Sequence, residues 1–285
     1  MMGYSFAASA RRWLTALLLV PVLATPAMSQ QSEETWKAIK PDIFGDKTIL
    51  DGDSFLTMDA PMRAEDAAVV PLTIRALKPQ AGETTIKAIT LVIDENPAPV
   101  AATVRFGPAA ATASFSTRLR VNAYSYIRAI AEMNDGSLRM IKRFVKASGG
   151  CSAPALKDED KSVSDIGQLR LRQFVQGDAE TKDYALAPND SGAMEAQIMI
   201  RHPNYSGLQM DQVTMLYIPA RFIQEIVLKR GDDLVLSMEG GISLSENPSF
   251  RFAFRRDGSG DLASRAEDTQ KNVFEKSWPV ERTGS

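Results

Sequence analysis

The sequence predicts an all-β protein made of two β-sandwich domains joined by a flexible linker. Two stretches of the chain consist of short runs in which apolar and polar residues alternate, with many β-branched side chains, as is typical of strands. Turn-forming residues separate the runs, and Asn134-Asp135-Gly136-Ser137 is typical of a tight hairpin. Between the two stretches, residues 146–161 are rich in Gly, Ser and mixed charges, which predicts a mobile, solvated connector.

The individual elements follow from the same alternation. The pattern predicts a short helix at 33–39 and strands at 69–77, 86–93, 100–106, 113–121, 124–133 and 138–145. In the second stretch it predicts strands at 195–201, 222–229, 233–238 and 250–255, then a final pair ending near residue 278. Residues 168–174 favour either a short strand or a helical turn. We therefore divide the chain into residues 1–29, 30–148, 149–193 and 194–285.

The first segment, 1–29, has the pattern of a secretory signal peptide. Arg11 and Arg12 precede an apolar run at 13–24, and Ala27-Met28-Ser29 is typical of a cleavage site. The run is shorter than the roughly 20 residues that a membrane-spanning helix needs. We therefore expect export to the periplasm, by the general or the twin-arginine route, and cleavage near Ser29. Cleavage would change the net charge from −2 to −4, which disfavours nucleic acid and anionic membranes as partners.

Cys151 is the one cysteine of the chain, so it cannot form an internal disulfide. In an oxidising compartment it is a buried inert thiol, an intermolecular partner or a reactive group. Its neighbours Gly149, Gly150 and Ser152 offer no apolar side chain to bury it, which favours an exposed, functional thiol on a flexible arm. On that interpretation, Cys151→Ser should cost within about 0.5 kcal/mol of stability.

Other candidate sites are weaker. His202 is the one histidine and has no companion at metal-ligand spacing, so the sequence predicts a structural role and no metal site. The segment Asp257-Gly258-Ser259-Gly260-Asp261 lacks the closing Glu of a calcium loop and predicts a plain turn. The dispersed Met residues are typical of core filler. We therefore expect neither a cofactor nor a self-contained catalytic site.

Two sets of sequence blocks resemble the subunits of a known carrier. Blocks resembling SoxY, the carrier subunit of the sulfur-oxidation system, are 92–101, 115–120, Met133-Asn134-Asp135-Gly136 and Gly149-Gly150-Cys151. Blocks resembling SoxZ are Ile200-Arg201-His202-Pro203, Gly207-Leu208, 218–223 and Ser245-Glu246-Asn247-Pro248. The fused arrangement is similar to the SoxYZ-like carriers associated with quinoprotein dehydrogenases. The chain departs from the SoxY pattern where Ser152, Ala153 and Pro154 follow the cysteine and the chain continues.

The resemblance implies two immunoglobulin-like sandwiches packed on each other, 30–148 being SoxY-like and 194–285 SoxZ-like. It implies that Cys151 carries a covalent adduct, sulfur-containing or other, with Gly149 and Gly150 giving flexibility. The expected partners are periplasmic oxidoreductases, either a quinoprotein dehydrogenase or a cytochrome c-type protein, and the carrier itself is not an enzyme. The alternative is a structural adaptor or chaperone of a periplasmic dehydrogenase.

Overall fold

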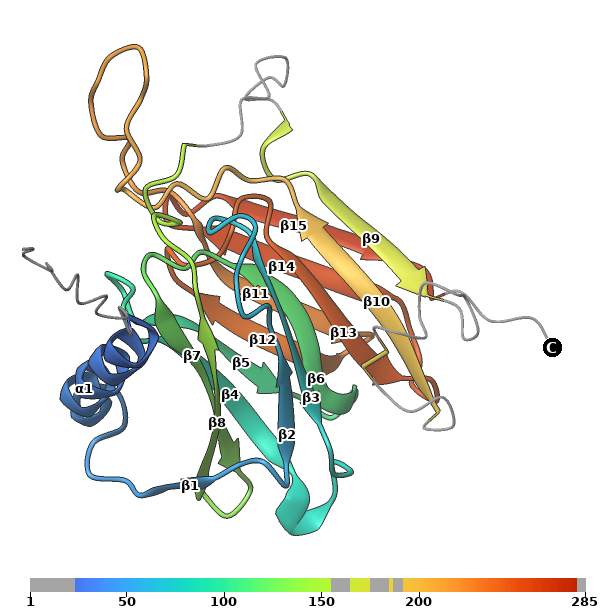
Figure 1. Cartoon of the computed structure of the whole chain (residues 1–285). Coiled ribbons are helices and arrows are strands. Elements are labelled where there is room, and N and C mark those ends of the chain that lie inside the picture. The colour runs from blue at the N-terminus through green and yellow to red at the C-terminus, as the bar shows by residue number, and fades with distance from the viewer. Residues whose placement is uncertain (1–23, 155–164, 175–184, 187–191, 281–285) are drawn as a thin grey trace, which may run out of the picture.

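The computed structural model describes residues 24–154, 165–174, 185–186 and 192–280. The predicted signal peptide up to residue 23 and the charged run 157–161 lie outside these residues. The described chain is mostly β-strand, as predicted (Figure 1). The first half has α1 Ala24–Phe44, the 3-10 helix Gly82–Thr84, β1 Ile49–Asp51, β2 Leu56–Asp59, β3 Val70–Ala76, β4 Ile86–Ile93, β5 Val100–Phe106, β6 Ala110–Leu119, β7 Ser125–Met133 and β8 Leu138–Val145. The second half has β9 Leu169–Phe174, β10 Ala193–Ile200, β11 Ile223–Arg230, β12 Asp233–Gly240, β13 Ser249–Arg255, β14 Leu262–Asp268 and β15 Val273–Trp278.

The strands form two layers that both run through the whole molecule. Within the described residues, one sheet has nine strands in the order β1-β8-β7-β4-β5-β12-β11-β14-β15, and the other has six in the order β2-β3-β6-β13-β10-β9. Each half therefore contributes strands to both layers and is itself a sandwich. β9 lies inside the predicted linker 149–193, and its antiparallel pairing with β10 makes that part of the linker a strand of the second half.

The junction between the halves consists of two strand pairs, β5–β12 and β6–β13. Val104 lies opposite Met238 in the first pair, and Phe115 lies opposite Phe252 in the second. All four side chains belong to one apolar cluster that extends through both halves. Because the backbone hydrogen bonds and the apolar core are both continuous here, the two halves form one structural unit and are not independent domains on a flexible linker.

Helix α1 is longer than the predicted 33–39 and covers the outer face of the nine-stranded sheet (Figure 1). Trp36 packs there against Val92 of β4 and Ile130 of β7. The helix ends at Phe44 because Gly45 adopts a left-handed φ of 61° and donates its N–H to the Pro41 carbonyl at 2.8 Å. The sheet thus has apolar cover on both faces at β4 and β7, which accounts for their nearly continuous burial.

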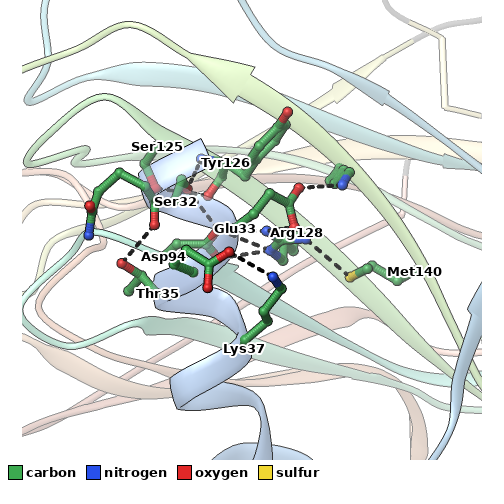
Figure 2. Close-up of polar contacts among 12 residues, drawn as sticks. Ser32, Glu33, Thr35, Lys37, Asp94, Ser125, Tyr126, Arg128 and Met140 are labelled. Carbon is green, nitrogen blue, oxygen red and sulfur yellow. Dashed lines mark hydrogen bonds and ion pairs between the residues drawn. The ribbon is translucent and has the colours of Figure 1, made fainter. Parts of the chain in front are cut away.

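A buried ion pair fastens α1 to the sheet (Figure 2). Nε and Nη2 of Arg128 donate to the two carboxylate oxygens of Asp94 at 2.9 and 2.8 Å, and Figure 2 shows Glu33 of α1 reaching the same guanidinium. Ser32 donates its hydroxyl to Asp94 at 2.8 Å, and the Arg128 guanidinium lies 4.6 Å from the Trp36 ring centroid. All the α1 residues in this network follow the predicted cleavage site at Ser29.

Replacing Arg128 should therefore destabilise the protein strongly. We expect Arg128→Met to lower the free energy of unfolding by about 3–5 kcal/mol, because Asp94 would remain buried without its cation. Arg105→Met, which removes an exposed pair with Glu239, should cost less than about 1 kcal/mol. Urea unfolding of both variants measures the difference, and Arg128→Met combined with Asp94→Leu should recover part of the loss. Equal small losses for both single variants would contradict this account.

Candidate functional site

The residues 149–153, here called the Cys151 segment, lie between the two halves of the molecule. On the first half, the N–H groups of Gly149 and Gly150 donate to the carbonyls of Asn122 and Val121 at 2.8 and 3.1 Å. On the second half, the Ser206 hydroxyl donates to the Cys151 carbonyl. Gln209 donates its amide Nε2 to the Ala153 carbonyl at 2.9 Å. The segment is therefore held from both sides by a small set of hydrogen bonds.

The prediction of an exposed thiol is wrong, because Cys151 is fully buried, with 0% of its surface exposed. Its neighbours in sequence are small and polar, as expected, but its cover comes from residues far away in the chain. Gly150 shows how close that cover is: a Cβ atom there would lie 2.1 Å from the Ala67 carbonyl oxygen. Because Gly150 has no side chain, the backbone at Ala67 can approach it closely. A larger residue at this position would push the segment outward. Cys151→Ser would therefore place a hydroxyl in a closed site, and the predicted surface-like cost no longer applies.

The burial controls the chemistry of the thiol. Burial raises the pKa of Cys151 to about 11, although the Arg120 guanidinium opposes this shift. The thiol is therefore protonated at neutral pH while the segment is closed. An unfolded or exposed cysteine has a pKa of about 8.5. Burial of the protonated thiol thus favours the folded state below about pH 8.5, and this contribution is lost as the pH rises toward 11.

Polar groups of both halves surround the segment. Asn96, in the turn after β4, donates its Nδ2 to the Arg120 carbonyl and to the Ser243 hydroxyl, both at 2.8 Å. Its Oδ1 accepts the N–H of Asn122 at 2.8 Å, so the same side chain fixes the residues that hold Gly149. Arg120 donates its Nη1 to the Leu244 carbonyl of the second half. Arg120 and Asn96 thus tie the site together across the junction.

A loop next to the segment carries exposed apolar side chains. Residues 208–217, here called the apolar loop, are closed by a bridge between Met210 and Tyr217. The turn is fixed by Asp211, whose carboxylate accepts the N–H of Thr214 at 2.7 Å. Val213 is 90% exposed, and the side chains of Met215, Leu216 and Tyr217 are also exposed. The prediction that the Met residues are core filler is therefore wrong for Met215, because the turn projects it into solvent.

The remaining candidates have structural positions. His202 is buried, with its Nδ1 2.8 Å from the Asn204 amide oxygen and its Nε2 3.5 Å from Asp268, and burial lowers its pKa. Asp257 pairs with Arg255 in a surface turn. Among the described residues, no group of three or more His, Cys, Asp or Glu side chains is placed to hold a metal ion. No helix in the described part of the chain is long and apolar enough to cross a membrane.

Sequence reasoning missed Arg120, Ser206 and Gln209. Arg120 ends one of the SoxY-like blocks and Ser206 immediately precedes a SoxZ-like block, so the resemblance marked this neighbourhood without a role for either residue. Their importance depends on the junction, which brings residues about 55 positions apart into contact with the Cys151 segment. No local pattern in the sequence carries that information.

Comparison with known proteins gives the family. The model of "Sulfur oxidation protein SoxY" matches residues 40–151, and that of "Sulphur oxidation protein SoxZ" matches residues 185–279. The chain belongs to the SoxY and SoxZ sulfur carrier family, with both domains in one polypeptide. The SoxY match ends at Cys151, and the two matched regions meet at the junction described above. SoxYZ proteins are non-catalytic carriers.

Two similar solved structures each match about two fifths of the chain. The sulfur carrier protein SoxY from Chlorobium limicola f thiosulfatophilum is 21% identical, with a TM-score of 0.33, and the match covers 41% of this chain and 99% of that one. A variant of the superoxide reductase (neelaredoxin) from Ignicoccus hospitalis is 15% identical, with a TM-score of 0.30, and the match covers 39% of this chain and 90% of that one. No curated protein sequence matches the chain.

Loosening the Cys151 segment should expose the thiol. We expect Gln209→Ala to speed the labelling of Cys151 by a small neutral thiol reagent about fivefold, because one hydrogen bond of about 1 kcal/mol is lost from the closed state. Gln212→Ala is the matched control, since Gln212 donates its amide to the Met210 carbonyl within its own loop. Mass spectrometry of samples quenched at timed intervals gives the labelling rate of Cys151 in each variant. Equal rates for the two variants would show that Gln209 does not hold the segment closed.

Proposed function

We propose that this chain is a periplasmic carrier that holds a covalent adduct on Cys151 and presents it to partner oxidoreductases. The observation that carries the proposal is the position of the one cysteine. It is the last residue of the SoxY match, and it lies where the SoxY and SoxZ halves meet. A carrier needs a single attachment atom on a segment that can be presented to an enzyme. The one thiol of the chain supports the first need, and the few hydrogen bonds that hold the Cys151 segment support the second.

The chemistry requires the segment to open. In the open state the thiol loses its proton to solvent with an ordinary pKa, and the thiolate sulfur attacks a sulfur atom of the donor. A new sulfur–sulfur bond forms, and the donor's leaving group departs with the electron pair of the broken bond. Each hydrogen bond that holds the segment contributes about 0.5–1.5 kcal/mol, so opening costs far less than unfolding the sandwich. Burial in the closed state would shield the thiol from stray oxidants between cycles.

The proposed partners are periplasmic oxidoreductases, a quinoprotein dehydrogenase or a cytochrome c-type protein. The resemblance to SoxYZ-like carriers associated with quinoprotein dehydrogenases supports the first class. The apolar loop supports a protein partner in general, because Val213 and Leu216 are exposed on a turn whose base, at Gln209, holds the Cys151 segment. The signal-peptide pattern supports the periplasmic location, and cleavage at Ser29 would leave the Ser32 contact to the sheet in place.

The second candidate is a structural adaptor for a periplasmic dehydrogenase. One observation favours it: Cys151 is fully buried, and burial raises the pKa of the thiol to about 11. A thiol that never left this site would be inert, and the exposed apolar loop would then be the functional surface. The two candidates differ in whether Cys151 ever holds an adduct.

Intact-mass spectrometry separates the two candidates. Protein purified directly from the native periplasm should carry an added mass on Cys151 that a thiol reductant removes, because the bond to the cargo is of the disulfide type. Cys151→Ala keeps a small apolar side chain in the closed site and should show no added mass, whereas Ser152→Ala, its neighbour, should be loaded normally. Wild-type protein that is unmodified under every growth condition would leave only the adaptor function.

A further inference from the structure

A cavity lies at the end of the sandwich away from the Cys151 segment. It has a volume of about 680 Å³ and is lined by the end of β3, the start of β4, the turn between β5 and β6, and Arg255 at the end of β13. β6 runs from this cavity toward Val121, which holds Gly150, and its ten residues span about 30 Å. Figure 1 shows the cyan turn between β3 and β4 and the orange apolar loop at opposite ends of the molecule. The cavity is therefore separate from the Cys151 site.

The protein itself holds the walls of the cavity in place. In the turn between β5 and β6, Gly107 donates its N–H to the carbonyl of Val235, in the second half, at 2.9 Å. A Cβ atom at Gly107 would lie 2.2 Å from the Leu234 carbonyl oxygen, so the two halves can meet here only because this residue is glycine. On the β3–β4 side, the Gln80 amide donates to the Ile86 carbonyl at 3.1 Å and accepts the Ile86 N–H at 2.9 Å. The cavity is therefore formed before any ligand binds.

The charged side chains that line the cavity are all basic. They are Lys78, Lys87 and Arg255, and no Asp or Glu of the described residues lines it. The chain as a whole has 35 acidic and 33 basic residues, so its composition does not account for this excess of positive charge. Both lysines are exposed, and neither forms an ion pair within the described part of the chain. Arg255 pairs with Asp257 at 2.9 Å, but both partners are exposed, and such a pair contributes little. The cavity therefore attracts anions.

Apolar side chains form much of the remaining wall. Phe106 lines the cavity and packs against Phe115 of the core, with ring centroids 6.3 Å apart. Leu77 also lines the cavity, and 50% of its surface is exposed although it is apolar. Pockets that bind small molecules have volumes of roughly 300–1,000 Å³ and combine mostly apolar walls with a few polar or charged groups. This cavity has both properties.

We propose that the cavity binds a small organic anion with an apolar body, such as an aromatic or alkyl carboxylate or sulfonate. The ammonium groups of Lys78 and Lys87 bind the acidic group, and the wall at Phe106 and Leu77 covers the apolar body. A neutral ligand of the same shape gains only the apolar contact. This inference goes beyond the carrier function and does not depend on an adduct on Cys151. Because the two sites lie at opposite ends of β6, a ligand in the cavity leaves the Cys151 segment free.

Two fluorescent probes of closely similar shape test the proposal on the full mature chain. Anilinonaphthalene sulfonate is anionic, and phenylnaphthylamine is its neutral counterpart without the sulfonate. We expect the wild-type protein to bind the sulfonate more tightly. Lys78→Gln combined with Lys87→Gln should lower the ratio of the two affinities about tenfold, because two charges near the sulfonate are lost. Lys47→Gln combined with Lys276→Gln is the matched control: it changes the net charge equally, outside the cavity, and should leave the ratio unchanged.

Two further variants locate the bound probe. Ala111→Phe places a ring in the cavity from its β6 wall and should weaken the binding of both probes. Val213→Ser combined with Leu216→Ser removes apolar surface from the apolar loop and should leave both affinities unchanged. An affinity ratio that is the same in the two lysine double variants would overturn the proposal, as would binding that is lost only in the apolar-loop variant. If Ala111→Phe does not fold, the lysine variants still decide, because their side chains are exposed. None of these outcomes bears on whether Cys151 holds an adduct.

Discussion

The hydrogen bonds between β5 and β12 and between β6 and β13 determine where the functional residues lie. They continue both sheets from the SoxY half into the SoxZ half. The loops at one end of the two halves are therefore held next to each other. Val121 on one side and Gln209 on the other then hold the same five-residue segment. Without the junction, the hydrogen bonds from Ser206 and Gln209 to the segment would be lost. The junction thus converts a polar, glycine-rich sequence into a buried site.

A carrier needs an accessible thiol, whereas Cys151 is buried. The two can be reconciled because the segment is held less strongly than the sheets. The sheets are held by continuous ladders and one apolar core, whereas the Cys151 segment is held by single hydrogen bonds to its flanks. Opening the segment leaves the ladders intact. The polar contacts around the segment include Arg120, which donates its Nη1 to the Leu244 carbonyl of the second half. Closure therefore keeps the thiol away from solvent and protonated at neutral pH.

The sequence predicted the strands well because each one alternates or is continuously apolar over its own length. The predicted strands 86–93, 100–106 and 138–145 coincide with β4, β5 and β8. Long-range contacts were beyond such reasoning. Gly149 and Gly150 indicate a flexible arm when they are considered alone, and only the packing of Gly150 against Ala67 shows that the segment is closed. The resemblance to SoxY and SoxZ correctly predicted the fused domains, but it gave no role to Arg120, Ser206 or Gln209.

The central claim is that Cys151 becomes reactive through local opening of its segment and not through unfolding. Labelling of Cys151 by methyl methanethiosulfonate at increasing urea concentrations, below the unfolding transition, tests it most directly. Local opening exposes little surface, so the account predicts a labelling rate that is nearly independent of urea until global unfolding begins. The contradicting result is a logarithm of the labelling rate that rises with urea from the lowest concentrations, with the same slope as global unfolding. Cys151 would then be an ordinary core residue, exposed only when the protein unfolds.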